Sequence, residues 1–298
     1  MSTVIRFSPD LSAWILHNLN QGCPPAALIQ EMQAQRMTAQ AAHAIVDAFI
    51  AARRLGQPTP VDSVVIEEPV PDYVYETPIF RAGTSIQTAD RLVRIAARAE
   101  RPMLAVLNNV LGAEECEELI ALARPRLEPS TVVDPQTGRN VVTGQRSSFG
   151  MFFRLQENAF ISRLDRRISE VMNLPIENGE GIQILYYPTG AQSTPHFDFL
   201  IPSNSANHDS LARSGQRVST MVTYLNDVEC GGETVFPEAG WAVSPQRGNA
   251  VYFEYCNSQN QLDHASLHAS NPIERGEKWV ASKWMRQRRF ISANMHGA

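Results

Sequence analysis

From residue 181 onward the chain consists of short β-type segments with no long helical segment between them. Gly, Pro and Asn clusters separate these segments and mark turns. Parallel strands need long crossover connections, usually helices, which this half of the sequence lacks. The pattern therefore predicts an antiparallel sandwich or jelly roll. The expected strands are 182–187, 196–200, 217–225, 234–236, 250–255, 265–269 and 278–286.

The first 180 residues contain mainly helical patterns. Helices followed by a β-rich half predict the α+β fold class. Apolar residues at helical spacing predict three short amphipathic helices within 8–56. A Pro-rich stretch, 57–80, is expected to be an extended linker with a short strand at 63–66. Further helices are expected at 89–98, 112–124 and 157–173, and a hairpin is expected around the turn residues 134–138. These patterns predict a helical region at 1–56, a linker at 57–80, and one domain at 81–298 with its core at 181–290.

Composition excludes several classes of protein. The formal net charge is -5, with 26 Lys and Arg against 31 Asp and Glu, whereas a nucleic-acid binder is usually basic. The four cysteines show no CxxC spacing, which disfavours a zinc ribbon or a disulfide scaffold. No run of about 18 apolar residues and no signal-peptide pattern is found. We therefore expect a cytoplasmic protein with no membrane or nucleic-acid partner.

Three residues of the β-rich half form a candidate metal site. In His196-Phe197-Asp198, residues i and i+2 of a strand face the same side, so the imidazole and the carboxylate can bind one cation. His268 lies on another expected strand and completes a facial triad of two histidines and one carboxylate, which is typical of non-haem Fe(II) oxygenases. His264 is a rival third ligand. A zinc hydrolase could use the same three residues, although no HExxH motif is present.

Lys278 favours the oxygenase over the hydrolase. It follows a turn at 272–276, and an antiparallel return strand would bring its ammonium back toward the metal. A fixed cation there suits the distal carboxylate of a bidentate organic-acid cofactor. Thr234 and Tyr187 could donate hydrogen bonds to the same carboxylate.

Residues 186–290 resemble the catalytic core of the prolyl 4-hydroxylases, a family of Fe(II)/2-oxoglutarate-dependent dioxygenases. The matching stretches are YYPTGAQSTPHFDF, GQRVSTMVTYLNDVECGGETVFP, PQRGNAVYF, SLHASNPI and GEKWVASKW. Weaker similarity reaches back to about residue 102, and residues 1–98 are not covered. The resemblance implies a double-stranded β-helix with flanking helices, Fe(II) held by His196, Asp198 and His268, and 2-oxoglutarate bound by Lys278, Tyr187 and Thr234.

The resemblance also assigns substrate contacts. Arg217 falls where the family has a substrate-facing arginine, Trp284 where it has an active-site tryptophan, and Arg146 at the end of its mobile substrate loop. One position departs from the family pattern. Ser193 stands three residues before His196, where the family often has a tyrosine that helps to hold the target proline. Two loops, 127–150 and 199–216, are expected to contact substrate and to become ordered when it binds.

The expected function is hydroxylation of a prolyl residue in a peptide or protein, with O2 consumed and succinate and CO2 released. Ascorbate is an additional candidate cofactor. The altered residue at Ser193 keeps open a second hypothesis, hydroxylation of a free amino acid or other small molecule. A third hypothesis is a non-catalytic module that binds metal or 2-oxoglutarate as a sensor. The sequence does not determine the oligomeric state.

Overall fold

The computed structural model describes residues 2–55, 58–67, 73–130, 132–133, 140–141 and 147–292 of the chain. The chain divides into two compact units, Met1–Asp72 and Tyr73–Ala298. In the described residues no helix has the length and apolarity needed to cross a membrane.

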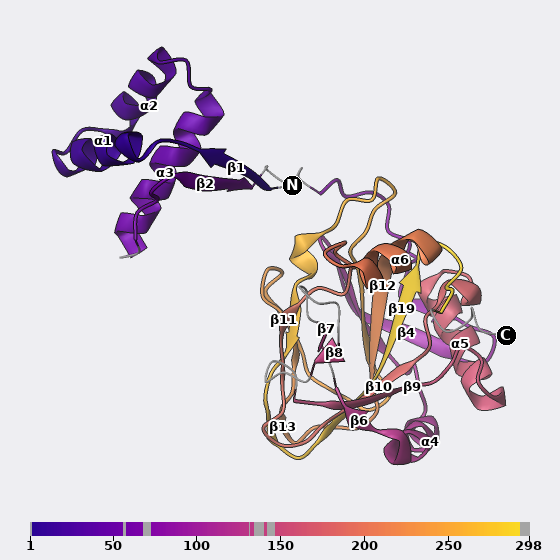
Figure 1. The fold of residues 1–298 in the computed structure, drawn as a ribbon. Helices are drawn as coiled ribbons and strands as arrows, with labels where there is room; N and C mark the ends of the chain where they lie inside the picture. The colour runs from indigo at the N-terminus through magenta and orange to yellow at the C-terminus, as the bar shows by residue number, and fades with distance from the viewer. Residues whose placement is uncertain are drawn as a thin grey trace. The chain divides into compact units, whose positions relative to one another are not determined.

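The first unit is a three-helix bundle closed by a two-stranded sheet (Figure 1). The three predicted helices are present, and Ser8 caps the first by accepting a hydrogen bond from the Leu11 N–H at 3.2 Å. Ile15, Ile45 and Phe49 are fully buried in its core. The first strand was not predicted; it pairs antiparallel with the second. The elements are β1 (Ser2–Arg6), α1 (Pro9–Asn20), α2 (Pro25–Ala34), α3 (Ala39–Leu55) and β2 (Ser63–Glu67).

The segment 57–80, expected as a linker, contains two ordered pieces that belong to different units. Strand β2 corresponds to the short strand expected there and is part of the first unit's sheet. The residues from Tyr73 onward are attached to the second unit. There Glu76 accepts hydrogen bonds from the backbone and hydroxyl of Ser258, and Glu254 accepts from the backbone N–H of Phe80.

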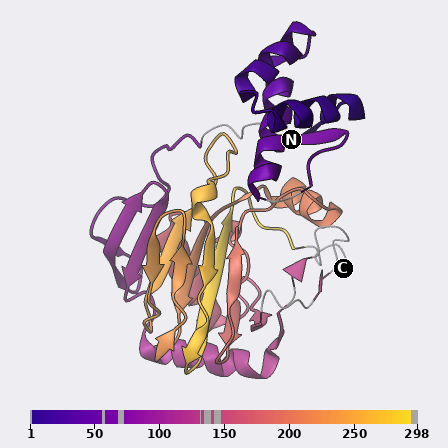
Figure 2. The ribbon, with the colours of Figure 1, turned by 90° about the vertical axis from the view of Figure 1, so that its left-hand side faces the viewer.

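The second unit is built on a nine-stranded antiparallel sheet. Figure 2 shows strands of this unit lying side by side. Its central strands come from the β-rich half of the sequence, and strands from the preceding segments extend it at both edges. In spatial order the strands are β3 (Ser85–Gln87), β4 (Leu92–Glu100), β5 (Met103–Asn108), β16 (Ala250–Glu254), β12 (Arg217–Tyr224), β19 (Lys278–Arg286), β10 (Gln183–Tyr187), β9 (Phe149–Phe152) and β6 (Glu128–Pro129).

Smaller sheets complete the second unit. A four-stranded sheet has the order β11 (Ser193–His196), β17 (His268–Ser270), β14 (Thr234–Phe236) and β15 (Trp241–Val243). Two more strands pair as β13 (Cys230–Gly231) and β18 (Ile273–Arg275). The predicted hairpin is confirmed by the antiparallel pairing of β7 (Val132–Val133) with β8 (Asn140–Val141), and its turn at 134–138 lies outside the described residues.

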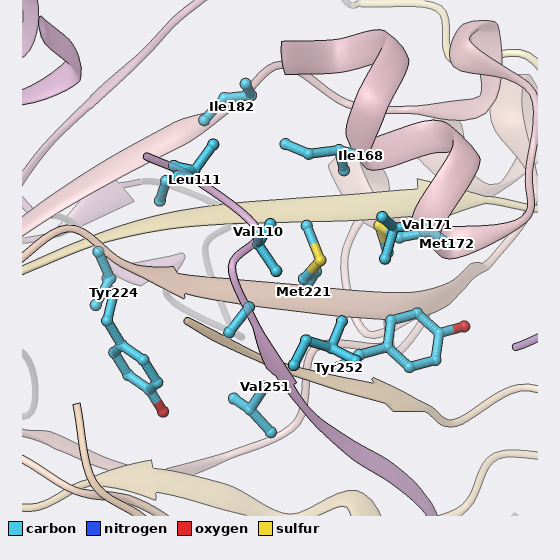
Figure 3. Close-up of a cluster of buried hydrophobic side chains, with 14 of the residues drawn as sticks. Val110, Leu111, Ile168, Val171, Met172, Ile182, Met221, Tyr224, Val251 and Tyr252 are labelled. Carbon is cyan, nitrogen blue, oxygen red and sulfur yellow. The ribbon is translucent and has the colours of Figure 1, made fainter. Parts of the chain in front are cut away.

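One face of the large sheet is covered by helix. Figure 3 shows Ile168, Val171 and Met172 of α5 pointing toward Met221 of β12 in a buried apolar cluster. Burial of such side chains is the main force that holds the layers together. The helices of this unit are α4 (Ala113–Ala123), α5 (Ala159–Met172) and α6 (Ser205–Ser214), with short 3-10 turns at η1 (Arg124–Arg126), η2 (Ile176–Asn178) and η3 (His264–Ser266).

Five local predictions were wrong. The segment 89–98, expected as a helix, forms most of β4, because Val93 and Ile95 extend the large sheet by pairing with β3 and β5. The expected loop 199–216 contains α6, which Asn204 caps by accepting from the Asn207 N–H at 2.9 Å. The expected strand 265–269 is replaced by η3 followed by β17, and the expected turn 272–276 contains β18.

The fifth error concerns the expected strand 196–200. Strand β11 runs over Ser193–His196, so it ends where the prediction began, and Asp198 lies beyond it. A shift in register interrupts the pairing of β11 with β17 between Ser193 and His196. The alternation of side chains along one strand therefore does not explain how His196 and Asp198 come together.

Candidate active site

His196, Asp198 and His268 form one cluster at the end of the four-stranded sheet. Their ligand atoms all lie within 4.8 Å of one another. Asp198 Oδ1 is 3.9 Å from His196 Nε2, and its Oδ2 is 3.6 Å from His268 Nε2. The two histidines face each other directly across β11 and β17, with ring centroids 4.4 Å apart. Cross-strand pairing, which the sequence did not reveal, brings the two imidazoles together.

Both imidazoles are oriented in the same way. The Nδ1 of His196 is 2.8 Å from the Thr194 carbonyl, and the Nδ1 of His268 is 3.0 Å from the Ser266 carbonyl. A carbonyl oxygen can only accept, so each Nδ1 carries a hydrogen, and in the neutral ring each Nε2 keeps its lone pair. The lone pairs are thus available to a metal, and the backbone fixes both ring orientations. Two neutral imidazoles and a carboxylate suit a divalent first-row metal such as Fe(II).

Asp198 is buried and held by a residue that the sequence analysis missed. Thr220, on β12, donates a hydrogen bond from its hydroxyl to Asp198 Oδ2 at 2.7 Å. Burial alone would raise the pKa of this carboxyl, but His268, His196, Arg217 and Thr220 together lower it to about 2. Asp198 is therefore a carboxylate at neutral pH, the form that binds a metal.

Lys278 is a buried ammonium on β19, with 2% of its surface exposed. Its Nζ donates to the Gly232 carbonyl at 2.6 Å and to Ser270 Oγ at 2.8 Å. In the described part of the chain no carboxylate forms an ion pair with it, and burial lowers its pKa to about 7 although Glu233 acts in the opposite direction. A buried cation without a counter-ion is costly, so the site is arranged for an anionic ligand.

The predicted cosubstrate residues and the candidate metal ligands line one pocket. Tyr187 is opposite Lys278 in the register of β10 and β19, and the ammonium lies 5.7 Å from its ring centroid. Thr234 is buried, and its hydroxyl accepts a hydrogen bond from Tyr224 at 2.9 Å. Ser193 also lines the pocket and is buried, so the position with the altered residue belongs to the site.

Trp284 and Arg217 lie together at another part of the site. Trp284 lines the pocket, and the Arg217 guanidinium stacks 4.1 Å from the centroid of its ring. Glu180 accepts two hydrogen bonds from Arg217, at 2.7 and 2.9 Å, and one from Arg286 at 3.0 Å. Arg217 also donates to the Asp198 carbonyl at 3.2 Å. The arginine is thus paired and contacts both Trp284 and the backbone of a candidate metal ligand.

The structure decides which of the two rival histidines is the candidate third ligand. His264 is exposed and packs edge-on against Phe197, with ring centroids 5.1 Å apart, and it is not part of the ligand cluster. His268 is part of that cluster. Arg146, the third expected substrate contact, lies outside the described residues.

Sequence reasoning missed the residues that support these side chains, namely Thr220, Ser270, Tyr224 and Glu180. Thr220 and Tyr224 lie in the matched stretch GQRVSTMVTYLNDVECGGETVFP, six and two residues before Asn226. Alternate residues of a strand lie on the same face, so Thr220 and Tyr224 could have been placed on the face of Val222, toward the site. Nothing in the sequence connects Glu180 with Arg217, because their contact depends on how the strands pair.

Known proteins resemble this chain over the same region. A sequence model of the 2OG-Fe(II) oxygenase superfamily matches residues 182–286. Prolyl 4-hydroxylase 1 of Arabidopsis thaliana is 42% identical over 202 residues, covering 63% of this chain and 70% of that protein. Prolyl 4-hydroxylase 5 of the same plant is 36% identical over 208 residues, covering 63% of this chain and 70% of that protein.

A solved structure matches as well. The viral collagen prolyl hydroxylase of Paramecium Bursaria Chlorella virus-1, in its 2OG complex, aligns with a TM-score of 0.49 and 25% identity, covering 61% of this chain and 95% of that chain. The plant relatives are more than 30% identical, and the alignments span more than two thirds of their length. The protein is therefore an enzyme of the prolyl 4-hydroxylase family, within the oxygenases that use Fe(II), 2-oxoglutarate and O2.

Proposed function

We propose that this enzyme hydroxylates a prolyl residue in a peptide or protein substrate. The observation that carries the proposal is the ammonium of Lys278, which has no carboxylate partner among the described residues and lies in the same pocket as the cluster of His196, Asp198 and His268. A metal-binding triad and a separate buried cation are the two elements that a bidentate keto acid with a distal carboxylate requires. The relatives' names, prolyl 4-hydroxylases, supply the prolyl substrate class.

In this proposal His196 Nε2, His268 Nε2 and one Asp198 oxygen bind the Fe(II) ion. With 2-oxoglutarate bound, the ion supplies the oxidative chemistry that converts O2, 2-oxoglutarate and a substrate C–H bond into succinate, CO2 and a C–OH group. The protein's part is positional. Thr220 fixes the carboxylate, and the carbonyls of Thr194 and Ser266 fix the two rings.

The distal carboxylate of 2-oxoglutarate would take the ammonium of Lys278 as its counter-ion. Tyr187 and Thr234 would add neutral hydrogen bonds, as the sequence indicated, and both line the pocket beside Lys278. Ser270 holds the ammonium in place by accepting a hydrogen bond at 2.8 Å. The lysine is therefore aimed before the ligand arrives, which lowers the entropic cost of binding.

Trp284 and Arg217 stay proposed as substrate-binding residues, and Arg146 stays a prediction because it lies outside the described residues. One observation favours a second candidate function. Ser193 leaves the pocket without the aromatic ring that the family pattern often places there, and this could suit a free amino acid or another small molecule.

A paired substitution tests the proposed chemistry. His268→Ala removes one ligand and should abolish 2-oxoglutarate-dependent succinate formation, with binding of Mn(II) reduced in parallel. The matched control is His264→Ala, which removes an exposed histidine four residues earlier and should keep wild-type activity. Activity that survived His268→Ala would refute the assignment. Comparing proline-containing peptides with free L-proline, by the mass gain of one oxygen atom, separates the two substrate classes.

We also propose the finer features that the sequence suggested. The large sheet and the four-stranded sheet, with the site between strands of both, support a double-stranded β-helix. The limits 1–56, 57–80 and 81–298, with a core at 181–290, stay predictions, as does a cytoplasmic location. Ascorbate is expected to sustain turnover, and measuring succinate formation with and without it would test this.

A further inference from the structure

Tyr255 is a fully buried tyrosine that lies directly after β16, beside the candidate metal site. Its backbone N–H donates to the Val218 carbonyl of β12 at 3.0 Å, which continues the pairing of the two strands. In this register its side chain lies diagonal to Thr220 on the same face of the sheet. Its ring packs against Phe199 and Phe253, with centroid distances of 6.2 and 5.8 Å. The backbone and the neighbouring rings therefore hold the Tyr255 hydroxyl in one position.

The Tyr255 hydroxyl begins a chain of hydrogen bonds that points toward Asp198. Its oxygen is 2.9 Å from that of Thr220, and Thr220 donates to Asp198 Oδ2 at 2.7 Å. A threonine has one hydroxyl hydrogen, and here the carboxylate receives it, so Tyr255 is the donor to Thr220. Burial raises the pKa of Tyr255 well above its usual value, so the tyrosine keeps its proton. Its donation stops the Thr220 hydrogen from turning away from Asp198.

The backbone carbonyl of Tyr255 supports the other side of the site. It accepts a hydrogen bond from the Asp263 N–H at 2.9 Å. Asp263 is 3% exposed and caps η3, where its Oδ1 accepts from the Ala265 N–H at 2.9 Å. Its carbonyl accepts from the Ser266 hydroxyl at 2.6 Å, and the Ser266 carbonyl accepts from His268 Nδ1. The position of the His268 ring therefore depends on where Tyr255 holds Asp263.

Tyr252 provides a comparison within the same strand. It is as fully buried as Tyr255, and its hydroxyl donates to Glu254 Oε1 at 2.9 Å. Figure 3 shows its side chain within the buried apolar cluster of the large sheet. Its hydroxyl bond is thus directed to a structural partner, whereas that of Tyr255 is directed to a support of the metal site.

We propose that Tyr255 is a positioning residue of the metal site, which holds Asp198 through its hydroxyl and His268 through its backbone carbonyl. The hydroxyl acts through Thr220, and the carbonyl acts through the turn η3. One residue thereby sets the relative placement of a carboxylate and an imidazole before the metal binds. This inference rests on the proposed assignment of His196, Asp198 and His268 as the metal ligands.

The first test measures Mn(II) binding to the full-length protein without O2, by competition with a chelator and by electron paramagnetic resonance. Tyr255→Phe removes only the hydroxyl and should weaken Mn(II) binding about fivefold, because the Thr220 hydroxyl can then turn away from Asp198. The spectrum of the bound ion should also change. Tyr252→Phe, the matched control, should lower the free energy of unfolding but keep the wild-type Mn(II) affinity and spectrum.

A double-mutant cycle tests the hydrogen-bond chain itself. In Thr220→Val the hydroxyl that links Tyr255 with Asp198 is absent, so Tyr255→Phe should cause no further loss of Mn(II) affinity. Losses that multiply in the double variant would refute the chain, because the tyrosine would then act by another route.

The turn that Tyr255 supports is tested at Asp263. Asp263→Ala removes the cap of η3 and should weaken Mn(II) binding about threefold, whereas Asp263→Asn keeps an accepting oxygen and should restore wild-type affinity. Asn158→Ala is the control. It removes the cap of α5, which accepts from the Ile161 N–H at 2.9 Å, and should change the free energy of unfolding alone.

The outcomes distinguish this inference from the proposed function. If His268→Ala loses Mn(II) but Tyr255→Phe binds it like wild type, the positioning role is refuted and the ligand assignment remains. If Tyr255→Phe does not fold, the Asp263 variants decide, and wild-type affinity in Asp263→Ala refutes the role. If His268→Ala binds Mn(II) as tightly as wild type, the ligand assignment and this inference fail together.

Discussion

Strand β19 carries both lysines of the sequence, and each is buried on a different face of the large sheet. Lys283, 2% exposed, forms an ion pair with Asp165 of α5 at 2.7 Å. Lys278, equally buried, has a carbonyl and a hydroxyl as partners but no carboxylate among the described residues. The difference shows the two uses of a buried charge: on the helix-covered face it is neutralised within the fold, and on the pocket face it is left for a ligand.

The largest expected effect concerns the paired lysine. Lys283→Met should lower the free energy of unfolding by about 3–5 kcal/mol, because Asp165 is left as a buried charge without its partner. Denaturant unfolding measures this. Adding Asp165→Asn should restore much of the loss, since the amide oxygen can still accept from the Gln156 N–H, as Asp165 Oδ2 does at 2.7 Å. Unchanged stability of the single variant would contradict the comparison.

Lys278→Met should change ligand affinity rather than stability. Among the described residues no carboxylate is left unpaired, so stability should be kept. Affinity for 2-oxoglutarate should fall about 30–100-fold through loss of a charge-assisted hydrogen bond. Titration calorimetry with Mn(II) in place of Fe(II), without O2, measures the affinity. A variant that bound 2-oxoglutarate as tightly as wild type would remove the main support for the cosubstrate site.

A smaller effect is expected at the metal side of the pocket. Thr220→Val keeps the side-chain shape and removes the hydroxyl that donates to Asp198 at 2.7 Å. Loss of such a supporting contact should weaken metal binding about tenfold. Competition between Mn(II) and a chelator reports this directly. Thr223→Val, on the opposite face of β12, is the control and should not change metal affinity.

The smallest effect is a pH dependence of 2-oxoglutarate binding. Glu233 is the acidic group that acts on Lys278, the rings of Tyr187 and Tyr224 flank it, and burial holds its pKa at about 7. A bound dianion stabilises the ammonium and raises this pKa. The complex therefore holds more protons than the free protein above pH 7, and affinity should fall as pH rises, by at most about tenfold per unit.

Lysine labelled at Cε gives this experiment a simple readout. The protein has two lysines, so two NMR signals are expected, and the signal of Lys278 should titrate near neutral pH and shift when 2-oxoglutarate is added. Lys283→Met identifies the remaining signal. Affinity that is constant from pH 6 to pH 9 would show that Lys278 is not the anchor of the cosubstrate.

Much of the fold was predictable where the local pattern and the tertiary environment agree. The three N-terminal helices and the strands at β10, β12, β16 and β19 follow from periodicity. The segment 89–98 was mistaken for a helix because Leu92, Val93, Ile95 and Ala96 also fit helical spacing. Pairing with β3 and β5 decides that this segment is a strand, and such long-range pairing has no local signature.

The candidate site was likewise predictable in part, and the rest of it depends on long-range strand pairing. The order and spacing of His196, Asp198, His268 and Lys278 favour an oxygenase, and the matching stretches within 186–290 indicate the family. The expected reason was partly wrong, since Asp198 lies beyond the end of β11. The imidazoles converge because β11 and β17 pair with His196 opposite His268. The supporting contacts of Thr220 and Glu180 were not predictable, because hydrogen-bond partners distant in sequence depend on strand register.

The sequence by itself determined the family, through the matching stretches within 186–290, and the four residues of the proposed metal and cosubstrate site. The tertiary structure decided what each lysine meets. Helix α5 brings Asp165 to Lys283, whereas the sheets around Lys278 bring hydroxyl and carbonyl oxygens but, within the described residues, no counter-ion. The free energy of a buried charge depends on its partners in space, and those partners are fixed by packing between elements far apart in the chain.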